Sequence, residues 1–176
     1  MITGRELSRD EVQRVWEIDR SEIIENIYYP ENSGLVLKPD RYDMTGWPPG
    51  EAELYTPLLF DCFDRGGWFY GLFNGDKLIG VAIVDNKFIG PRRDLLQLKF
   101  LHVSCAYRRQ GLGQKLFDLA KTEARARGAK GFYISATPSE NTINFYMRLG
   151  SVRTAEPDPE LFELEPEDIH LECPIP

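Results

Sequence analysis

The sequence predicts one α/β domain built around a mixed β-sheet. Between residues 68 and 103, three apolar strand-like runs are separated by turn dipeptides, which is the pattern of an antiparallel meander. From residue 95 onward, strand and helix patterns alternate, which predicts a right-handed parallel crossover. A chain of 176 residues can bury one real core. We therefore expect a single domain over residues 1–176, with its motif-bearing part at about 68–150.

The N-terminal segment is expected to hold a short strand followed by helix. Ile2 to Leu7 fits a first strand, and Ser8 with Glu11 has the spacing of a capping box, in which the two residues satisfy free amides at a helix start. The apolar residues that follow have spacings suited to an amphipathic helix or a helix pair: Val12, Val15, Trp16 and Ile23.

The stretch from Tyr29 to Gly50 is rich in Pro, Gly, Asn and Asp and predicts a long loop of the kind that binds ligands or forms lids. A helix is expected from Glu51 to Asp64, with a fresh start near Pro57. Gly66-Gly67 ends it, because glycine readily takes the left-handed conformation that follows many helices.

A β-hairpin is expected next, with strands at 68–73 and 77–84. Asn74-Gly75 between them favours the positive φ angles of a type I′ turn. A third strand covers 95–103, after a turn at Gly90-Pro91. Its apolar residues change parity, from Leu96, Leu98 and Phe100 to Leu101 and Val103. Either a bulge or burial of both faces explains this change, and the bulge is our preferred interpretation.

The C-terminal third alternates helix and strand. A helix follows Gly111-Leu112-Gly113 and runs to about Arg127, where Gly128 stops it. A strand at 132–137 and a helix at 139–149, capped by Ser139 and ended by Gly150, come next. The last expected strand is 169–173.

Composition excludes several classes of protein. A net charge of −7 argues against a general nucleic-acid binder, which would present a basic surface. No apolar run approaches the roughly 20 residues that span a bilayer, and the N-terminus lacks the apolar stretch of a secretory signal. The three cysteines form no CxxC pair and predict reduced thiols, mostly buried. We expect a cytoplasmic protein without a metal site.

The segment from Leu101 to Lys115 carries the strongest chemical signal. A strand leads into a loop with Gly111 and Gly113, and a helix follows directly. Free amides at a helix N-terminus bind anions, and glycines let phosphate oxygens approach the backbone. Between Leu95 and Phe117 there is no acidic residue, although the chain as a whole is acidic. The basic residues of this stretch are Lys99, Arg108, Arg109 and Lys115.

A polyphosphate ligand and a purely structural role for this loop both remain open. The segment lacks the GK[ST] ending of a P-loop and the three-glycine spacing of a dinucleotide fingerprint. A tight strand-to-helix turn could use the glycines for packing alone. The acid-free flank and the paired arginines support ligand binding enough that the two interpretations are about equally favoured.

Two motifs resemble the GNAT acetyltransferase superfamily. Arg108-Arg109-Gln110-Gly111-Leu112-Gly113, after Val103, resembles its Q/R-x-x-G-x-G/A signature. The stretch from Ser139 to Gly150 resembles the family's later helix, with Tyr146 four residues before the glycine. Their order and spacing make the pair more specific than either alone.

The resemblance implies a sheet that is mostly antiparallel, has helices on both faces and is splayed by a bulge at the cofactor strand. It also implies acetyl-coenzyme A as acyl donor, with the strand Leu101-His102-Val103 pairing with the pantetheine arm. Arg108 would brace a loop that holds the pyrophosphate through the amides of Arg109, Gln110, Gly111, Leu112, Gly113 and Gln114.

The later helix has one departure from the family pattern. Many members carry Asn where Ser139 stands, and the nearest Asn here is Asn141, so either residue could contact the cofactor. Tyr146 would lie near the thioester sulfur and act as general acid, since a phenol with a pKa near 10 can protonate a departing thiolate. The alternative role for Tyr146 is structural, as a core aromatic residue whose hydroxyl is hydrogen-bonded.

The acceptor is expected to be an amine, on a small molecule or on a protein, and it needs a base. Glu22 is our choice, with Glu25 nearby and a solvated surface role as the alternative. His102 could titrate near neutrality, but we expect its side chain to serve packing. A domain that binds acyl-coenzyme A without turnover is the alternative function, and a homodimer is one expected assembly.

Several other residues are candidates for the acceptor site. Tyr28, Tyr29 and Trp47 could form an apolar wall of the acceptor pocket, or could anchor the long loop. The acidic run from Glu156 to Asp168 is expected to be a solvated tail, with a cation-attracting rim as the alternative. His170 is expected to be structural.

Overall fold

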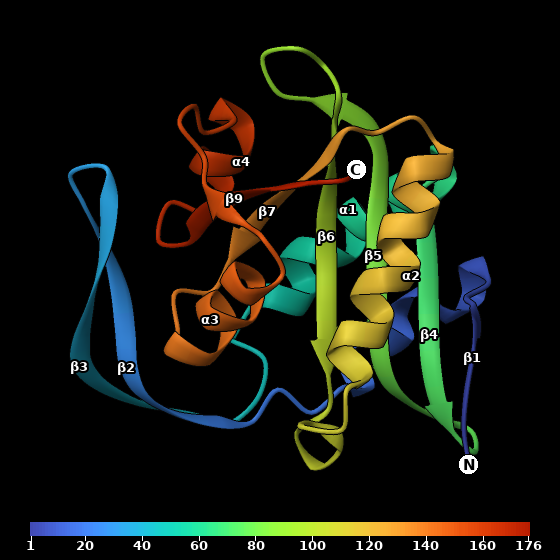
Figure 1. The fold of residues 1–176 in the computed structure, drawn as a ribbon. Helices are drawn as coiled ribbons and strands as arrows, with labels where there is room; N and C mark the ends of the chain where they lie inside the picture. Colours follow the sequence, from blue (N-terminus) through green and yellow to red (C-terminus); the bar gives the residue numbers. More distant parts are fainter.

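A seven-stranded sheet forms the centre of the computed structural model, which describes residues 1–176. Its strands are β1 (Ile2–Glu6), β4 (Trp68–Asn74), β5 (Lys77–Ile89), β6 (Leu95–Val103), β7 (Gly131–Ala136), β8 (Val152–Arg153) and β9 (Ile169–Pro174). In space they follow the order β1-β4-β5-β6-β7-β9-β8 (Figure 1). Only β6 and β7 are parallel, which confirms the predicted crossover and the mixed, mostly antiparallel sheet.

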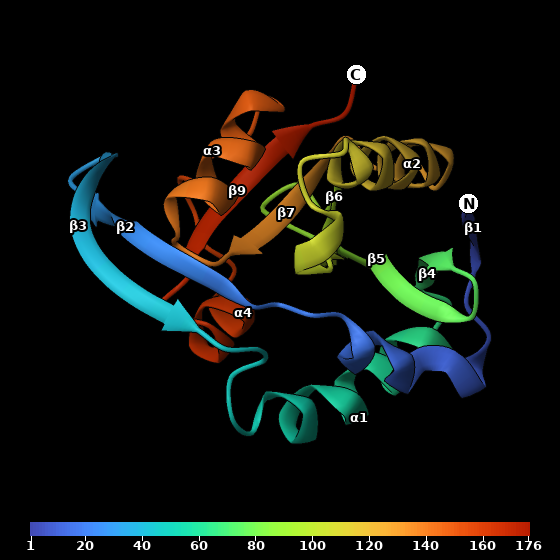
Figure 2. The same ribbon diagram turned by 90° about the horizontal axis from the view of Figure 1, so that it is seen from below.

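Helices cover both faces of this sheet. They are α1 (Glu51–Asp64), α2 (Leu112–Ala126), α3 (Glu140–Arg148), the short α4 (Pro159–Leu164) and two 3₁₀ helices, η1 (Arg9–Glu17) and η2 (Cys105–Tyr107). One core lies between the sheet and α2, which buries Leu116, Phe117, Ala120 and Ala124. A second core lies on the opposite face, under α1 and η1 (Figure 2).

The segment predicted as a long loop folds into a two-stranded ribbon, so that prediction is wrong. β2 (Glu22–Glu31) and β3 (Gly34–Met44) pair antiparallel through a two-residue turn, in which Asn32 has a φ of 54°. Figures 1 and 2 show the ribbon standing beside α3, away from the main sheet. Most of its side chains are exposed, and so the strands lack the apolar alternation that marks a half-buried strand.

The N-terminal helix is shorter than predicted and is a 3₁₀ helix. The carboxylate of Glu11 accepts from the backbone N–H of Ser8 at 2.9 Å, in accordance with the capping pattern. The helix ends at Glu17, and Ile23 belongs to β2 instead. Helix α1 begins and ends as predicted, but it runs through Pro57 without a fresh start.

The predicted β4–β5 hairpin is present with a different turn. Asn74 pairs with Lys77, so the turn residues are Gly75 and Asp76 rather than Asn74 and Gly75. Gly75 has a φ of 60° and Asp76 has no positive φ, whereas a type I′ turn needs positive φ at both positions. The acidic run near the C-terminus also holds structure that was not predicted, because α4 lies within it.

Candidate functional site

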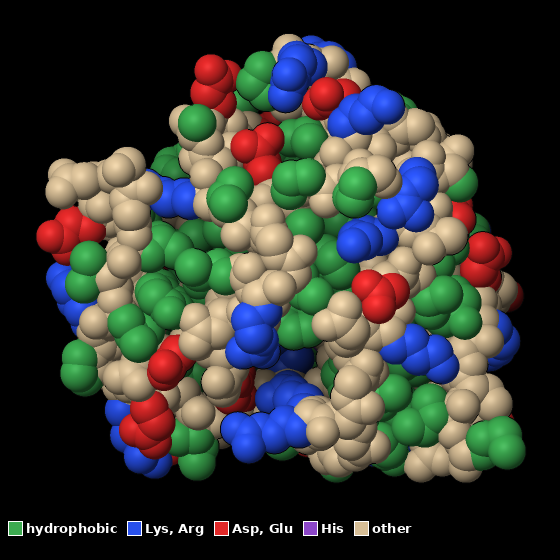
Figure 3. Space-filling view, in the orientation of Figure 1, with side chains coloured by type: hydrophobic (Ala, Val, Ile, Leu, Met, Phe, Trp, Pro, Cys, Tyr) green, Lys and Arg blue, Asp and Glu red, His purple; other side chains and the backbone are tan.

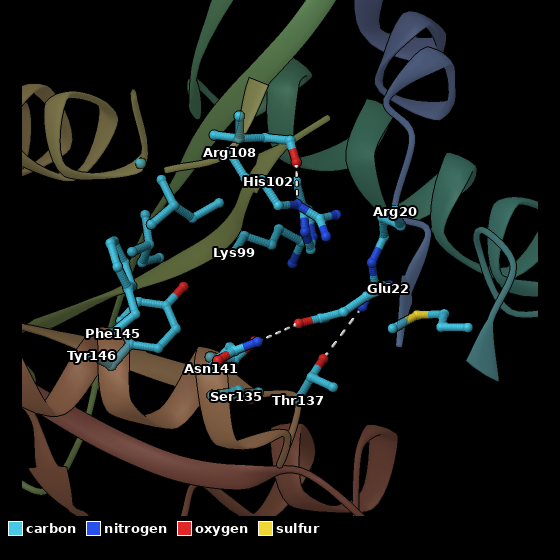
Figure 4. Close-up of a pocket in the computed structure, with 17 residues that line it drawn as sticks. Arg20, Glu22, Lys99, His102, Arg108, Ser135, Thr137, Asn141, Phe145 and Tyr146 are labelled. Carbon is cyan, nitrogen blue, oxygen red and sulfur yellow. Dashed lines mark hydrogen bonds between the residues drawn. The ribbon is translucent and has the colours of Figure 1, made fainter. Parts of the chain in front are cut away.

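A cleft of about 240 Å³ opens where strands β6 and β7 separate (Figure 4). The two strands pair only from Leu95 with Gly131 to Gln97 with Tyr133. Beyond these pairs, the cleft is walled by β6, β7, the start of α2, α3 and the segment that leads into β2. The separation leaves one edge of β6 without a strand partner.

A β-bulge in β6 sits at the point of separation. Ile83 of β5 pairs with Phe100, whereas the next residue, Val84, pairs with Leu98, so Lys99 is the extra residue. The bulge puts Leu101 on the same side as Leu98, against the α2 core, and leaves Phe100 in the opposite core. The change of parity in the sequence therefore reports a real bulge, as preferred above.

Beyond the bulge, the main-chain N–H and C=O groups of two residues of β6 face the cleft. The N–H of Ser104 donates to the carbonyl of Ile79 on β5 at 2.8 Å. Since N–H and C=O groups alternate sides along a strand, those of Leu101 and Val103 face away from β5 and toward the cleft. These are the two residues that the resemblance assigns to the pantetheine arm.

The loop before α2 presents a row of free amides. The N–H groups of the six residues from Arg109 to Gln114 donate to no backbone carbonyl. Three of them, Leu112 to Gln114, lie in the first turn of α2, which has no intrahelical acceptor for them. Two residues hold the loop open with left-handed backbone: Arg109 with φ 61° and Gly111 with φ 78°. Successive free amides at a helix N-terminus form an anion-binding cradle.

Arg108 fixes the position of this loop. Its guanidinium donates to the carbonyls of Val103 at 2.9 Å, Ser21 at 3.0 Å and Asp19 at 3.2 Å. The bonds tie the loop to β6 and to the segment that leads into β2. This geometry is the bracing role expected for Arg108.

Tyr146 comes from α3 and projects its hydroxyl into the cleft (Figure 4). The residue is 6% exposed, and its ring packs against Phe117 and Phe145. Burial alone raises the pKa of the phenol above its usual value. The hydroxyl therefore keeps its proton at neutral pH and faces the cleft.

The structure separates Ser139 from Asn141. Asn141 lines the cleft, and its amide donates to the carboxylate of Glu22 at 3.0 Å. Ser139 is 2% exposed, its hydroxyl donates to Thr142 at 3.0 Å, and its backbone bridges to Ile27 of the ribbon. Asn141 therefore lines the cleft, whereas Ser139 does not.

Among the candidate bases, Glu22 and His102 line the cleft. Glu25 does not, since it is exposed on the ribbon and pairs with Arg41 at 3.0 Å. Burial, together with Arg20 and Arg108, lowers the pKa of His102 well below its ordinary value, so the imidazole is neutral at pH 7. Its ring also packs edge-on against Trp47, with ring centroids 5.0 Å apart.

The aromatic residues considered for an acceptor wall are anchors instead. The hydroxyl of Tyr28 donates to Asn144 of α3 at 2.6 Å, and that of Tyr29 donates to Asp40 within the ribbon. The indole N–H of Trp47 donates to the carbonyl of Ile18 at 2.9 Å. His170 has the expected structural role, because its ring bonds to the hydroxyl of Tyr133 and the carbonyl of Glu165.

Sequence reasoning missed several side chains of the cleft, above all Arg20 and Lys99. Both are nearly buried, with side chains 11% and 10% exposed. Arg20 lies in the short segment between η1 and β2, which has no motif. Lys99 lies in the acid-free stretch of the sequence, but the sequence pattern does not show that it is the bulged residue. The other missed lining residues are Met44, Leu98, Ser135, Ala136, Thr137, Thr142 and Phe145.

No group of three or more His, Cys, Asp and Glu side chains that could hold a metal ion occurs in the structure. None of its helices is both long and apolar enough to cross a membrane. The three cysteines are unpaired; Cys62 and Cys173 are buried, and Cys105 is exposed.

Comparison with known proteins gives one family. Residues 24–150 match the model of the acetyltransferase (GNAT) family. No curated protein sequence matches the chain.

Among solved structures, nourseothricin acetyltransferase is 17% identical, with a TM-score of 0.70 and 99% of each chain covered. A Bacillus anthracis protein, named as a candidate streptothricin acetyltransferase and solved with acetyl coenzyme A, is 17% identical, with a TM-score of 0.74 over 100% of this chain and 99% of that one. The PaiA N-acetyltransferase of Thermoplasma acidophilum, solved with coenzyme A, is 16% identical, with a TM-score of 0.64 and 99% of each chain covered. At these identities the likeness concerns the fold.

Proposed function

The chain belongs to the acetyltransferase (GNAT) family, and from this premise we propose how its cleft transfers an acetyl group to an amine. The protein is an N-acetyltransferase that uses acetyl-coenzyme A. The acyl donor supplies the acetyl group as a thioester, and the chain's own residues bind it, orient the acceptor and move two protons.

The row of free amides from Arg109 to Gln114 is the observation that carries the assignment of the donor site. Six unpaired donors beside a helix N-terminus suit a pyrophosphate, and the glycines at 111 and 113 leave its approach open. The main-chain groups of Leu101 and the N–H of Val103 face the cleft and suit the amides of the pantetheine arm, whereas the carbonyl of Val103 already accepts from Arg108. Asn141, rather than Ser139, is the side chain of α3 placed to contact the cofactor from the cleft wall.

Tyr146 is proposed as the general acid. When the bond between carbon and sulfur breaks, the departing thiolate needs a proton, and the buried phenol still holds one at neutral pH. The hydroxyl lies in the cleft in which the thioester would be bound.

Glu22 is proposed as the general base. It is the carboxylate that lines the cleft, and the amide of Asn141 fixes its orientation. As the amine nitrogen bonds to the acetyl carbon, the carboxylate takes up the proton that the nitrogen loses. The acid and the base thus come from different elements, α3 and β2, across one cleft.

Two measurements test this function. Isothermal titration should give saturable binding of acetyl-coenzyme A and much weaker binding of ATP, which shares the polyphosphate but not the pantetheine arm. Release of free thiol should then depend on an added amine, measured over a panel of small amines and peptides. Binding of ATP as tight as that of acetyl-coenzyme A, or thiol release that ignores the amine, would contradict the proposal.

A further inference from the structure

The side chains that line the cleft carry a net positive charge, whereas the chain as a whole is acidic. Arg20, Lys99 and Arg108 line it together with a single carboxylate, Glu22, whereas the whole chain carries a net charge of −7. Figure 3 shows Lys and Arg side chains gathered around a hollow near the lower end of β6. The cleft is therefore locally cationic.

Two of these cations keep hydrogen-bonding capacity to spare. Arg108 is committed to three carbonyls, but the contacts of Arg20 with Glu51 and Thr137 are 3.5 and 3.4 Å long. Those of Lys99 with Asp85 and Gln97 are both 3.4 Å. Contacts of this length are weak for charged donors, which prefer about 2.7–2.9 Å. Arg20 and Lys99 thus have N–H groups that no strong acceptor uses.

The carboxylates near these cations do not neutralise them fully. Asp85 is shared by Arg65, at 2.8 Å, and Lys99, at 3.4 Å; burial raises the pKa of Asp85, but the hydrogen bonds from Arg65 and the charge of Lys99 lower it to about 2. Burial lowers the pKa of Arg20 although Glu51 opposes that change. Burial also raises the pKa of Glu51, and its contact with Arg20 is 3.5 Å long.

Ser135 adds a polar group that has no partner at all. Its hydroxyl is buried and makes no hydrogen bond, although it lines the cleft. Gln97 and Tyr133 are the last paired residues of β6 and β7, and Lys99 and Ser135 each lie two residues further along. Both residues therefore lie where the two strands have separated, and both line the cleft.

These groups lie on the face of the sheet opposite the pyrophosphate cradle. Lys99 contacts Asp85, which Arg65 holds at the end of α1, and Arg20 stacks over Trp47 at 4.8 Å, on the α1 side. On β7, Ile134 and Ala136 face the α2 core, so Ser135 faces the other way. The phosphates of the donor would lie on the α2 side and leave this cationic corner free.

We propose that Arg20, Lys99 and Ser135 form a subsite for an anionic group, and that the acceptor is an amine that also carries a carboxylate or a phosphate. The inference rests on the function proposed above. Glu22 makes no ion pair with Arg20 or Lys99 and has Asn141 as its partner, so it stays available to the amine end of such an acceptor. Buried donors that lack acceptors favour a ligand that supplies them.

The first test compares matched acceptors. Thiol release is measured with ω-amino carboxylates of increasing chain length against their neutral amides, with O-phosphoethanolamine against ethanolamine, and with diamines. The anionic member of a pair should have the higher kcat/KM, by roughly tenfold or more, as expected for a charge-assisted contact. Preference for the neutral amides or the diamines throughout the panel would overturn the subsite.

Variants locate the effect. Arg20→Gln should remove most of the preference, and Ser135→Ala should reduce it several-fold, while the KM for acetyl-coenzyme A stays unchanged. Ser151→Ala is the matched control, because Ser151 is the other buried hydroxyl without a partner and lies outside the cleft. Equal losses for charged and neutral acceptors in Arg20→Gln and Ser135→Ala would refute the assignment.

A binding measurement separates this inference from the proposed chemistry. The N-acetylated forms of the same pairs are titrated into protein saturated with coenzyme A, which needs no turnover. Selective binding of the anionic forms without any thiol release from the amines would support the subsite and refute the transferase function. Thiol release with no selectivity in either assay would support the transferase function and refute the subsite.

Discussion

Replacing Tyr146 with Phe should abolish most of the activity without weakening the fold. The hydroxyl makes no hydrogen bond in the protein, since burial alone shifts its pKa, so its removal leaves no partner unsatisfied. The free energy of unfolding should change by less than about 0.5 kcal/mol. Loss of the proton donor for the leaving thiolate should lower kcat by about 10²- to 10⁴-fold.

Tyr133→Phe is the matched control, because Tyr133 is buried in the same sheet with a fully used hydroxyl. That hydroxyl bonds to His170 Nδ1 at 2.6 Å and accepts from the N–H of Asp158 at 2.9 Å. Removing the hydroxyl leaves both partners without a hydrogen bond and should cost about 1–3 kcal/mol of stability. This corresponds to a drop in Tm of roughly 2–12 °C for a chain of this size. Its kcat at a temperature where it is folded should stay near that of the wild type.

The assay pair is thiol release at saturating acetyl-coenzyme A and calorimetric unfolding of the free protein. The reasoning predicts opposite patterns, with lost activity at full stability for Tyr146→Phe and lost stability at full activity for Tyr133→Phe. An unchanged rate in Tyr146→Phe would remove the phenol from the chemistry. A Tm lowered as much as in Tyr133→Phe would mean that the hydroxyl has a structural partner.

Three further predictions follow from the same geometry. Glu22→Gln should lower kcat by about 10²- to 10⁴-fold with the Kd for acetyl-coenzyme A unchanged, and Glu25→Gln, outside the cleft, should have no effect; similar rates for both variants would exclude Glu22 as the base. Gly111→Ala and Gly128→Ala should each cost about 1–2 kcal/mol, since both glycines have positive φ and an added Cβ meets no neighbour. In calorimetric titrations only Gly111→Ala should also weaken acetyl-coenzyme A, and equal weakening by the two would remove the loop from the donor site. Burial, with Glu165 beside it, raises the pKa of Asp168 to about 7, above the ~4 of an unfolded chain. The folded state holds this proton more tightly, so the stability it contributes is present below about pH 4 and is lost as the pH rises through 7. Asp168→Asn should therefore raise the Tm at pH 8 and leave it unchanged near pH 4; the same shift at both pH values would contradict the assignment.

The sequence predicted the motif-bearing half of the fold well because its signals are local. Gly111, Gly128 and Gly150 all take the positive φ angles that mark helix boundaries, so the two helices that they bound were placed within about two residues. The parity change in β6 was also local, because it follows from the side-chain alternation of a single strand. Predictions of this kind need no knowledge of distant partners.

The ribbon and the turn at Gly75 were missed for a different reason. The β2–β3 pair is stabilised largely by contacts with α3, such as the hydrogen bond from Asn26 to Glu140, and only a few of its apolar side chains, such as Ile24, are buried. No period appears in the sequence when neither face of a ribbon is a core. At the β4–β5 turn, the register depends on how the strands pair, and moving the turn by one residue keeps the same glycine in place.

The cleft shows the limit most clearly, because its charges come from segments far apart in sequence. Tyr146 and Asn141 belong to a recognisable helix, whereas Arg20 reaches the site through the path of the chain between η1 and β2. No spacing rule links Arg20 to Thr137, which lies 117 residues away and yet accepts from its guanidinium. Such residues become visible only when the topology is known.

The bulge at Lys99 connects these observations. One extra residue in β6 shifts the strand so that Leu101 can face the α2 core, and it lies just beyond the point where pairing with β7 ends. The side chain of the same residue lines the cleft, as does Ser135 with its unpartnered hydroxyl, and the ammonium group of Lys99 contacts Asp85 and Gln97. The proposed donor site and the proposed anionic subsite therefore both lie beside this bulge.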